Sequence, residues 1–407
     1  MTTLESEPNP ILDSELQQIL AEQILDERKR RWLLILLFVL LLLISCVGFF
    51  FYRYAMKPEP LPAMLPEVIA KNIVYPPVYK FSIPGVNRPV GVAISPDGQR
   101  IYVAESGGDR MIKMFDRDGN LILTFALPGT DPSSRRPSYL AVDSLGQVFV
   151  SDNYNHAIDI FDADGKFLDA IIGVDLSLSK AVAAQNGGGL PEGTTYYYNN
   201  VDKYVYYQLP GKPLQQISVG EREGWTPLGL RFDSQGNLMV TNLISDKHSV
   251  IIFPGPALNP PLLDFNPQVV ELGGKSQEDG QLSFPNSVVT DSKGNYYVSD
   301  GNNGRISYWT SDLTYKTFFG FGSAESALNL PRGEWMSADD HLHVADAVGQ
   351  HIRVYDISGD EPTFLYSFGD FGITPGLFNY PTDICMDETG RVYVADRENN
   401  QVQVWSY

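Results

Sequence analysis

Five histidines are the side chains of this sequence that most readily suggest metal binding or acid–base catalysis. His341 and His343 would lie on one face of a strand, a spacing that a zinc site can use, but no third ligand is evident. His343 stands where similar segments carry Tyr297 and Tyr393, so we expect it to pack as an aromatic residue would. No metal site is therefore predicted here.

The other three histidines fall at one recurring position, at the start of a strand. Its members in six copies of the pattern are Arg110, His156, His248, Arg305, His351 and Gln401. A position that accepts histidine, arginine and glutamine alike is expected to satisfy a hydrogen bond of a loop rather than to coordinate a metal.

A second recurring position ends a strand in a polar side chain. Its members are Glu105, Asp152, Asn242, Asp300, Asp346 and Asp396. An active site needs one constellation rather than a ring of equivalents, so we expect these side chains to cap nearby backbone N–H groups. Carboxylate oxygens suit hard cations, which leaves a calcium ion in a central channel open as an alternative.

No catalytic residue is predicted. The chain has no nucleophile elbow, no phosphate loop and no zinc-protease motif. Its net charge of −19 repels phosphate backbones, which makes nucleic acid a poor partner.

One stretch, residues 194–220, is rich in tyrosine. It contains Tyr196, Tyr197, Tyr198, Tyr204, Tyr206 and Tyr207. Alternate side chains of a strand face opposite sides, so we expect half of these rings in the core, as Tyr196, Tyr198, Tyr204 and Tyr206 or their alternates. The exposed remainder is the predicted binding surface, with Tyr198 and Tyr207 as the first residues to replace, because amphipathic rings suit contact with protein, peptide or glycan.

The elements that must position these residues are short strands in a repeated order. Residues 136–173, 284–320 and 380–407 are three clear copies. Each runs from a proline or the residue just before it through an alternating strand, a turn with glycine and an apolar strand that ends in the polar position above.

These copies resemble NHL repeats, the four-stranded blades of a β-propeller, and the resemblance covers residues 78–407. It implies an all-β propeller. Some related propellers are lyases or lactone hydrolases that depend on metals, so a metal-dependent lyase or lactonase is the alternative to a binding role.

Spacing predicts the number of blades. The strand-opening prolines Pro89, Pro137, Pro227, Pro285, Pro331 and Pro381 are separated by 48, 90, 58, 46 and 50 residues. Because 90 is two periods, we expect a degenerate seventh blade within residues 174–225, with residues 178–183 as its inner strand. Six blades with an inserted loop is the alternative.

The last copy ends after three strands. Residues 78–83 resemble the fourth strands of other copies, so we expect them to complete this blade and close a monomeric ring.

Before the repeats, residues 32–52 form an uncharged apolar run that is long enough to cross a membrane. Four basic residues precede it, at 28–31, which predicts a cytoplasmic segment 1–31 and an extracytoplasmic remainder, with a proline-rich stalk over 53–77. Cys46 ends a lipobox-like sequence, so a lipoprotein anchored at that cysteine is the alternative. We thus expect a non-enzymatic propeller that binds a partner outside the cytoplasm.

Overall fold

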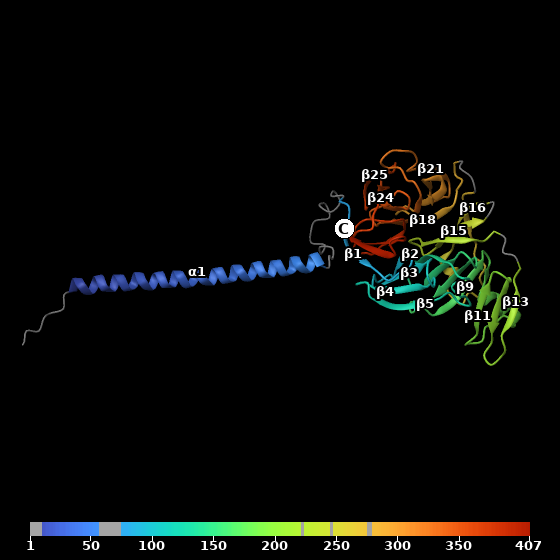
Figure 1. Ribbon diagram of the computed structural model, residues 1–407, viewed down its shortest axis with the longest axis horizontal. Coiled ribbons are helices and arrows are strands. Elements are labelled where there is room, and N and C mark those ends of the chain that lie inside the picture. Colours follow the sequence, from blue (N-terminus) through green and yellow to red (C-terminus); the bar gives the residue numbers. More distant parts are fainter. Residues whose placement is uncertain (1–9, 57–74, 221–223, 245–246, 275–278) are drawn as a thin grey trace, which may run out of the picture. The chain divides into compact units, whose positions relative to one another are not determined.

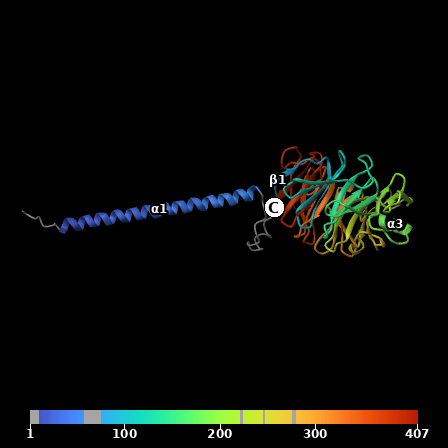
Figure 2. The same ribbon diagram turned by 90° about the horizontal axis from the view of Figure 1, so that it is seen from below.

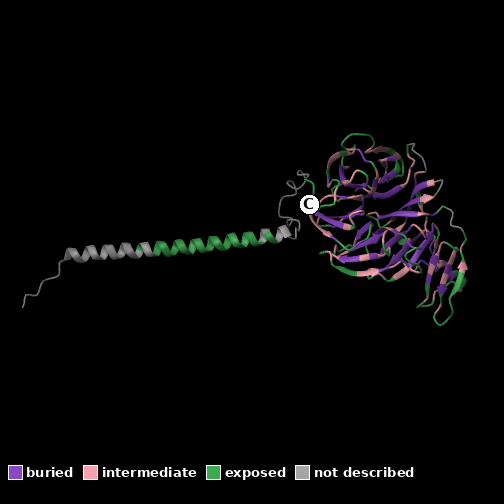
Figure 3. Ribbon diagram, viewed as in Figure 1, coloured by how far each residue is buried: buried purple, intermediate pink, exposed green. Residues whose placement is uncertain are grey.

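The computed structural model describes residues 10–56, 75–220, 224–244, 247–274 and 279–407. The chain divides into two compact units, residues 1–59 and 60–407. The first contains the helix α1 (Pro10–Met56), in which Arg28–Phe49 is long and apolar enough to cross a membrane. The described side chains of this segment are exposed (Figure 3). Most of the predicted stalk, residues 57–74, lies outside the described residues.

The second unit is nearly all-β and antiparallel, and six of its sheets share one plan (Figure 1). Each begins with an inner strand that opens on a proline: β2 (Pro89–Ile94), β6 (Pro137–Val142), β14 (Pro227–Phe232), β18 (Pro285–Thr290), β22 (Pro331–Met336) and β26 (Pro381–Met386). The second strands are β3 (Arg100–Glu105), β7 (Val148–Asp152), β15 (Leu238–Ile244), β19 (Tyr296–Asp300), β23 (His341–Asp346) and β27 (Arg391–Asp396).

The outer strands follow in the same order. The third strands are β4 (Ile112–Asp116), β8 (Ala157–Phe161), β16 (Lys247–Phe253), β20 (Arg305–Trp309), β24 (His351–Asp356) and β28 (Gln401–Ser406). The fourth are β5 (Leu121–Phe125), β9 (Phe167–Gly173), β17 (Val270–Leu272), β21 (Tyr315–Phe319), β25 (Thr363–Phe368) and, in the last sheet, β1 (Val78–Ile83). Two short 3-10 helices, η1 (Gly255–Ala257) and η2 (Gly301–Asn303), lie in loops.

The six inner strands stand in a ring. Each packs beside the next along the chain, and β26 packs beside β2. The last sheet has the order β1-β28-β27-β26, so a strand from the start of the second unit completes the sheet at its end. We call these six sheets the ring. Its arrangement is propeller-like.

Small residues let neighbouring inner strands approach. A side chain on Gly91, Gly229 or Gly333 would collide with backbone atoms of the next inner strand, at Ser138, Asn286 and Asp383 respectively. The sheets therefore alternate between a glycine and a larger residue at the third inner position, an alternation that a ring of six accommodates.

The seventh sheet lies outside the ring. It consists of β11 (Thr195–Asn199), β12 (Tyr204–Gln208) and β13 (Gln215–Ser218), and its strands pair only with one another. We call it the tyrosine sheet. Figures 1 and 2 place it, with the helix α3 (Leu178–Gln185), at the rim of the second unit beyond β9 and away from β1.

The inner strand predicted for a seventh blade is wrong, and the six inner strands of the ring contact one another without it. The reason is local. The proposed inner strand 178–183 folds as α3, where Leu178, Ala181 and Val182 form one buried face at helical spacing. Ser177 caps this helix by accepting a hydrogen bond from the Lys180 backbone N–H at 3.1 Å. A two-residue strand, β10 (Leu176–Ser177), joins the helix to β9.

Candidate binding surfaces and the channel

The strand-ending polar residues hold the loops that lead into the inner strands. Asp152 accepts a hydrogen bond from the Arg136 backbone N–H at 3.1 Å, and Asp396 accepts one from Asn379 at 2.7 Å. The same bond to the loop before the inner-strand proline is made by Glu105, Asn242, Asp300 and Asp346. These side chains serve the backbone, as the capping interpretation expects.

The histidine position divides into two. Asp346 pairs across the sheet with His351, as Asp300 does with Arg305, but Asp152 pairs with Ala157. His156 therefore lies one residue earlier, at a backbone φ of 51°. Arg110, at a φ of 52°, and His248 are likewise one residue early, because Glu105 bonds to Met111 and Asn242 pairs with Ser249. Grouping all six at one position was wrong, since spacing alone does not fix which residue adopts the left-handed turn.

His248 holds a loop, whereas His351 lies beside a strand-ending carboxylate. The ring nitrogen Nδ1 of His248 accepts a hydrogen bond from the Phe284 backbone N–H at 2.9 Å. His351 Nε2 lies 3.7 Å from an Asp346 carboxylate oxygen, and burial lowers the pKa of this imidazole.

His343 is buried between two sheets. Its Nδ1 lies 3.1 Å from the His341 carbonyl oxygen and its Nε2 lies 2.6 Å from the Tyr407 hydroxyl, which in turn lies 2.7 Å from the Tyr366 hydroxyl. Both ring nitrogens are engaged, which leaves no free lone pair for a zinc ion.

The centre of the ring is occupied by Arg231. Its guanidinium group donates to Asp383 Oδ1 at 2.5 Å and to the Ile384 carbonyl oxygen at 3.1 Å. Weaker contacts reach the carbonyl oxygens of Glu334 at 3.2 Å and Leu140 at 3.4 Å. Arg231 is a buried residue, 5% exposed, and joins four sheets of the ring.

The carboxylates beside Arg231 accept hydrogen bonds from backbone N–H groups. Asp383 also accepts hydrogen bonds from the Val92 and Ile384 backbone N–H groups. Glu334 accepts one from Ser299 at 2.8 Å, and burial raises the pKa of its carboxyl well above the usual range. Across the described part of the chain, no three His, Cys, Asp or Glu side chains group closely enough to hold a metal ion. Calcium in the channel stays a prediction, since backbone and amide carbonyl oxygens can also serve as its ligands.

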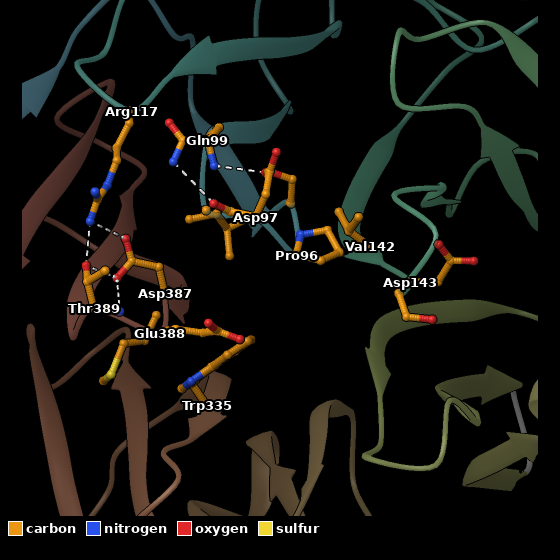
Figure 4. Close-up of a pocket in the computed structure, with 15 residues that line it drawn as sticks. Pro96, Asp97, Gln99, Arg117, Val142, Asp143, Trp335, Asp387, Glu388 and Thr389 are labelled. Atoms are coloured by element: carbon orange, nitrogen blue, oxygen red, sulfur yellow. Dashed lines mark hydrogen bonds and ion pairs between the residues drawn. The ribbon is translucent and has the colours of Figure 1, made fainter.

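A broad hollow opens at the end of the ring where the inner strands finish. Trp335 lines each of its three adjoining parts. Figure 4 shows Arg117 linked to Asp387 and Thr389 on one side, with Asp143 across the hollow. The acids hold their own turns: Asp143 accepts hydrogen bonds from the backbone N–H groups of Leu145 and Gln147. Acidic side chains line this hollow, but Asp387 is paired with Arg117 and Asp143 accepts hydrogen bonds from its own turn.

A smaller pocket lies at the opposite end, where the inner strands begin. Arg332 and Arg397 line it together with the aromatic residues Phe284 and Tyr380. Sequence reasoning missed Arg332, which directly follows an inner-strand proline. After the other inner-strand prolines this position holds valine, serine, leucine, asparagine or threonine, so its single cationic member was the available signal.

One face of the tyrosine sheet is buried against other elements, and the other face points outward. Tyr196, Tyr198 and Tyr207 point inward and are 8%, 5% and 7% exposed. They pack with α3 and β9, and the Tyr196 hydroxyl donates to the Leu168 carbonyl oxygen at 2.9 Å. The choice of Tyr198 and Tyr207 as surface positions was therefore wrong, because a turn between β11 and β12 sets Tyr196 opposite Tyr207.

The outward face carries Tyr197, Tyr204 and Tyr206, each half-buried. Tyr197 and Tyr206 are stacked, with ring centroids 5.2 Å apart and planes 13° apart. A hydrogen bond to Asp202, 2.6 Å from the hydroxyl, raises the pKa of Tyr206 to about 12. The result is a fixed aromatic platform. Whether it binds a partner stays a prediction.

One buried carboxylate, that of Asp169, connects the helix α3 to the ring. Asp169 accepts hydrogen bonds from the backbone N–H groups of Ser179 at 3.0 Å and Leu262 at 2.8 Å. It thereby ties α3 to the loop that follows η1, in the next sheet of the ring.

Comparison with known proteins agrees with this architecture. The NHL repeat family matches residues 135–161 and 378–405. NHL repeat-containing protein 2 of Gallus gallus is 23% identical over 375 residues, which are 83% of this chain and 49% of that protein. NHL repeat-containing protein 3 of Homo sapiens is 29% identical over 122 residues, 24% of this chain and 35% of that protein. The chain thus spans half or less of these relatives.

Two solved structures share the fold. A streptogramin B lyase has a TM-score of 0.50 at 12% identity, covering 81% of this chain and 98% of its own. A gluconolactonase from Xanthomonas campestris has a TM-score of 0.50 at 15% identity, covering 82% and 95%. At these identities the likeness concerns the fold alone. The protein carries NHL repeats in a propeller-like unit.

Proposed function

We propose that this NHL-repeat protein is a non-enzymatic binding propeller, held at the membrane by α1 and recognising a protein, peptide or glycan outside the cytoplasm. The observation that carries the proposal is the tyrosine sheet. It lies outside the ring, so ring closure does not require it, yet its outward face keeps three tyrosine rings in a fixed arrangement. Rigid aromatic side chains give contact area at low entropic cost.

The channel supports a binding role over catalysis. Its central cation and carboxylates bond to one another and to backbone groups of several sheets. A hub of this kind fixes the sheets relative to one another, and the bonds of Arg231, Asp383 and Glu334 to protein groups favour a structural role for these three side chains over acid–base catalysis. The lyase and the lactonase of similar fold lend the alternative no residue-level support, because only the fold is shared.

Replacing Tyr197 and Tyr206 together by serine tests the proposal. We expect molecules that copurify with the full chain from native membranes, after cross-linking, to be lost from this variant while the ring stays folded. Tyr308→Ser is the matched control, because Tyr308 is a half-buried ring stacked on Tyr297 at 4.8 Å within the ring. Equal recovery from both variants would place the interface elsewhere.

The enzymatic alternative has its own test. The full chain in detergent is assayed against lyase, lactonase and esterase substrates with and without EDTA. We expect no turnover. Turnover that EDTA abolishes would replace the binding role by a metal-dependent reaction.

The membrane topology is tested separately. Protease added to intact cells should digest the second unit, because basic residues 28–31 favour retention of the N-terminus in the cytoplasm. Incorporation of a lipid label that Cys46→Ala abolishes would support the lipoprotein alternative instead. A second unit that stays protected until the cells are lysed contradicts both.

A further inference from the structure

We propose that the pocket at the end of the ring where the inner strands begin binds a carboxylate that carries an apolar group. Its lining combines Arg332 and Arg397 with aromatic and aliphatic side chains, among them Phe284, Tyr380 and Leu228. The site is distinct from the tyrosine sheet and adds a ligand to the proposed function rather than deepening it.

Arg332 is a cation whose hydrogen-bond partners are neutral. Its Nη1 donates to Asn286 Oδ1 at 2.6 Å, and its Nη2 donates to the Tyr380 hydroxyl at 3.2 Å. Its Nε is buried and has no hydrogen-bond partner. Among the residues that the structure describes, no carboxylate lies within ion-pair distance of Arg332. A partly buried guanidinium without a counter-charge is costly, and an anionic ligand would supply that charge.

The orientation of this guanidinium is fixed in advance. Asn286 is fully buried, and its amide nitrogen donates to the Phe284 carbonyl oxygen at 2.9 Å, so its Oδ1 is held toward Arg332. The Arg332 guanidinium also lies over the Phe284 ring, 5.8 Å from the centroid. A guanidinium that is already ordered loses little entropy when it binds a carboxylate through two N–H groups.

The surroundings add positive charge. Arg397 lies over the Tyr380 ring at 5.5 Å and shares the carboxylate of Glu398, at 2.8 Å, with Arg88, at 2.6 Å. Two guanidinium groups thus share one carboxylate beside an Arg332 that has none. This local excess of cations contrasts with a chain whose net charge is −19 and would favour an anion at this mouth.

The backbone at the mouth is strained in a repeated way. Arg88, Phe284 and Tyr380 each precede an inner-strand proline and each has a positive φ, of 48°, 57° and 65°. Non-glycine residues rarely adopt this conformation, and such strain gathers at functional sites. Here it directs two aromatic rings, those of Phe284 and Tyr380, to the pocket lining.

The pocket favours a monovalent carboxylate with an apolar substituent. Of the two guanidinium groups that line the pocket, that of Arg397 is paired with Glu398, whereas that of Arg332 has no carboxylate partner among the described residues and can take the carboxylate of a ligand. Val90, Leu228 and the rings of Tyr139 and Phe284 offer an apolar wall beside it. The C-terminal residue of a peptide with an apolar side chain and a free arylalkanoic acid share this chemistry.

Titration calorimetry on the full chain in detergent micelles tests the site with three probes. They are 3-phenylpropionate, the peptide Gly-Gly-Phe with a free C-terminus and the same peptide with an amidated C-terminus. We expect the two carboxylates, or the peptide carboxylate alone, to bind, and the amidated peptide to bind at least tenfold more weakly. If 3-phenylpropionate and the free peptide both bind, the site accepts small carboxylic acids as well as peptide C-termini. If only the free peptide binds, the ligand is the C-terminus of a peptide.

Arg332→Gln should weaken carboxylate binding at least tenfold. Arg332→Lys should retain an intermediate affinity, because lysine keeps the positive charge but lacks the two N–H groups with which a guanidinium binds a carboxylate. Arg136→Gln is the matched control, since Arg136 is exposed, precedes an inner-strand proline and does not line the pocket. Binding that is unchanged in Arg332→Gln, equal for the amidated peptide or undetectable for both acids overturns the proposal. Tyr197→Ser/Tyr206→Ser should bind the probes normally, which separates this site from the proposed partner surface.

Discussion

The ring and the tyrosine sheet are built from the same kind of short antiparallel strand, but their buried polar groups do different work. In the ring, each strand-ending polar residue holds a loop, and Arg231 links four sheets at the centre. Beside the tyrosine sheet one buried carboxylate, Asp169, ties α3 to the ring, and the outward face of the sheet keeps three half-buried aromatic rings. The contrast indicates that the polar groups of the ring hold its sheets together, whereas the outward face of the added sheet is not used to close the ring.

The largest effect should come from breaking the hub. Arg231→Met leaves the carboxylate of Asp383 buried without its cation, which we expect to lower the free energy of unfolding by about 3–5 kcal/mol. Urea unfolding of the full chain in detergent, followed by tryptophan fluorescence, measures it. Arg231→Met/Asp383→Leu should recover part of the loss, because the buried charge is then gone. A single variant as stable as the wild type would show that the hub does not hold the ring.

The stability of the ring should also depend on pH. Burial lowers the pKa of His343 to about 4, below the value of about 6.5 in an unfolded chain. The unfolded chain therefore binds a proton that the folded protein excludes, so the stability that His343 contributes is complete above about pH 6.5 and is lost as the pH falls toward about 4.

Comparing the wild type with His343→Gln between about pH 7 and about pH 4.5 isolates this contribution from that of the carboxylates. We expect the wild type to lose about 2–3 kcal/mol more than the variant over this range. Identical pH profiles would mean that His343 takes up its proton without unfolding.

The same substitution placed in the two regions sharpens the comparison. Gly229→Ala would push a methyl group into the backbone of Asn286 in the next inner strand, and we expect a loss of about 1–3 kcal/mol. Gly189→Ala, in the loop between α3 and β11, meets nothing within 4 Å and should change stability by less than about 0.5 kcal/mol. Equal losses from both would contradict the close packing of the inner strands.

The smallest effect should lie within the tyrosine sheet itself. Tyr197→Ser removes a half-buried ring that stacks on Tyr206 and lies against Gly129 in the loop after β5, and it should cost about 1 kcal/mol. Tyr198→Ser removes a buried ring of the inward face. Hydrogen exchange should then rise over β11–β13 in Tyr198→Ser while the ring keeps its protection. Exchange that rises equally in the ring would show that the two regions unfold together.

The sequence by itself determined the strands of the ring and the polar positions that end them. Proline, an alternating strand, a turn glycine and a strand-ending polar residue all act over a few neighbours, and their order recurs. Period-2 alternation also indicated that half of the tyrosines are buried, but not which half, because that depends on the register between β11 and β12.

Only the tertiary structure decided how residues 174–225 are used and which charges meet. The number of residues between two prolines does not distinguish a blade from a helix and a sheet added outside, since both fill the same length of chain. The partners of Arg231 lie in sheets far along the sequence, and Arg332 is distinguished by the carboxylate that it lacks. Both depend on contacts between sheets, and the only local sign of either was the cationic residue that follows Pro331.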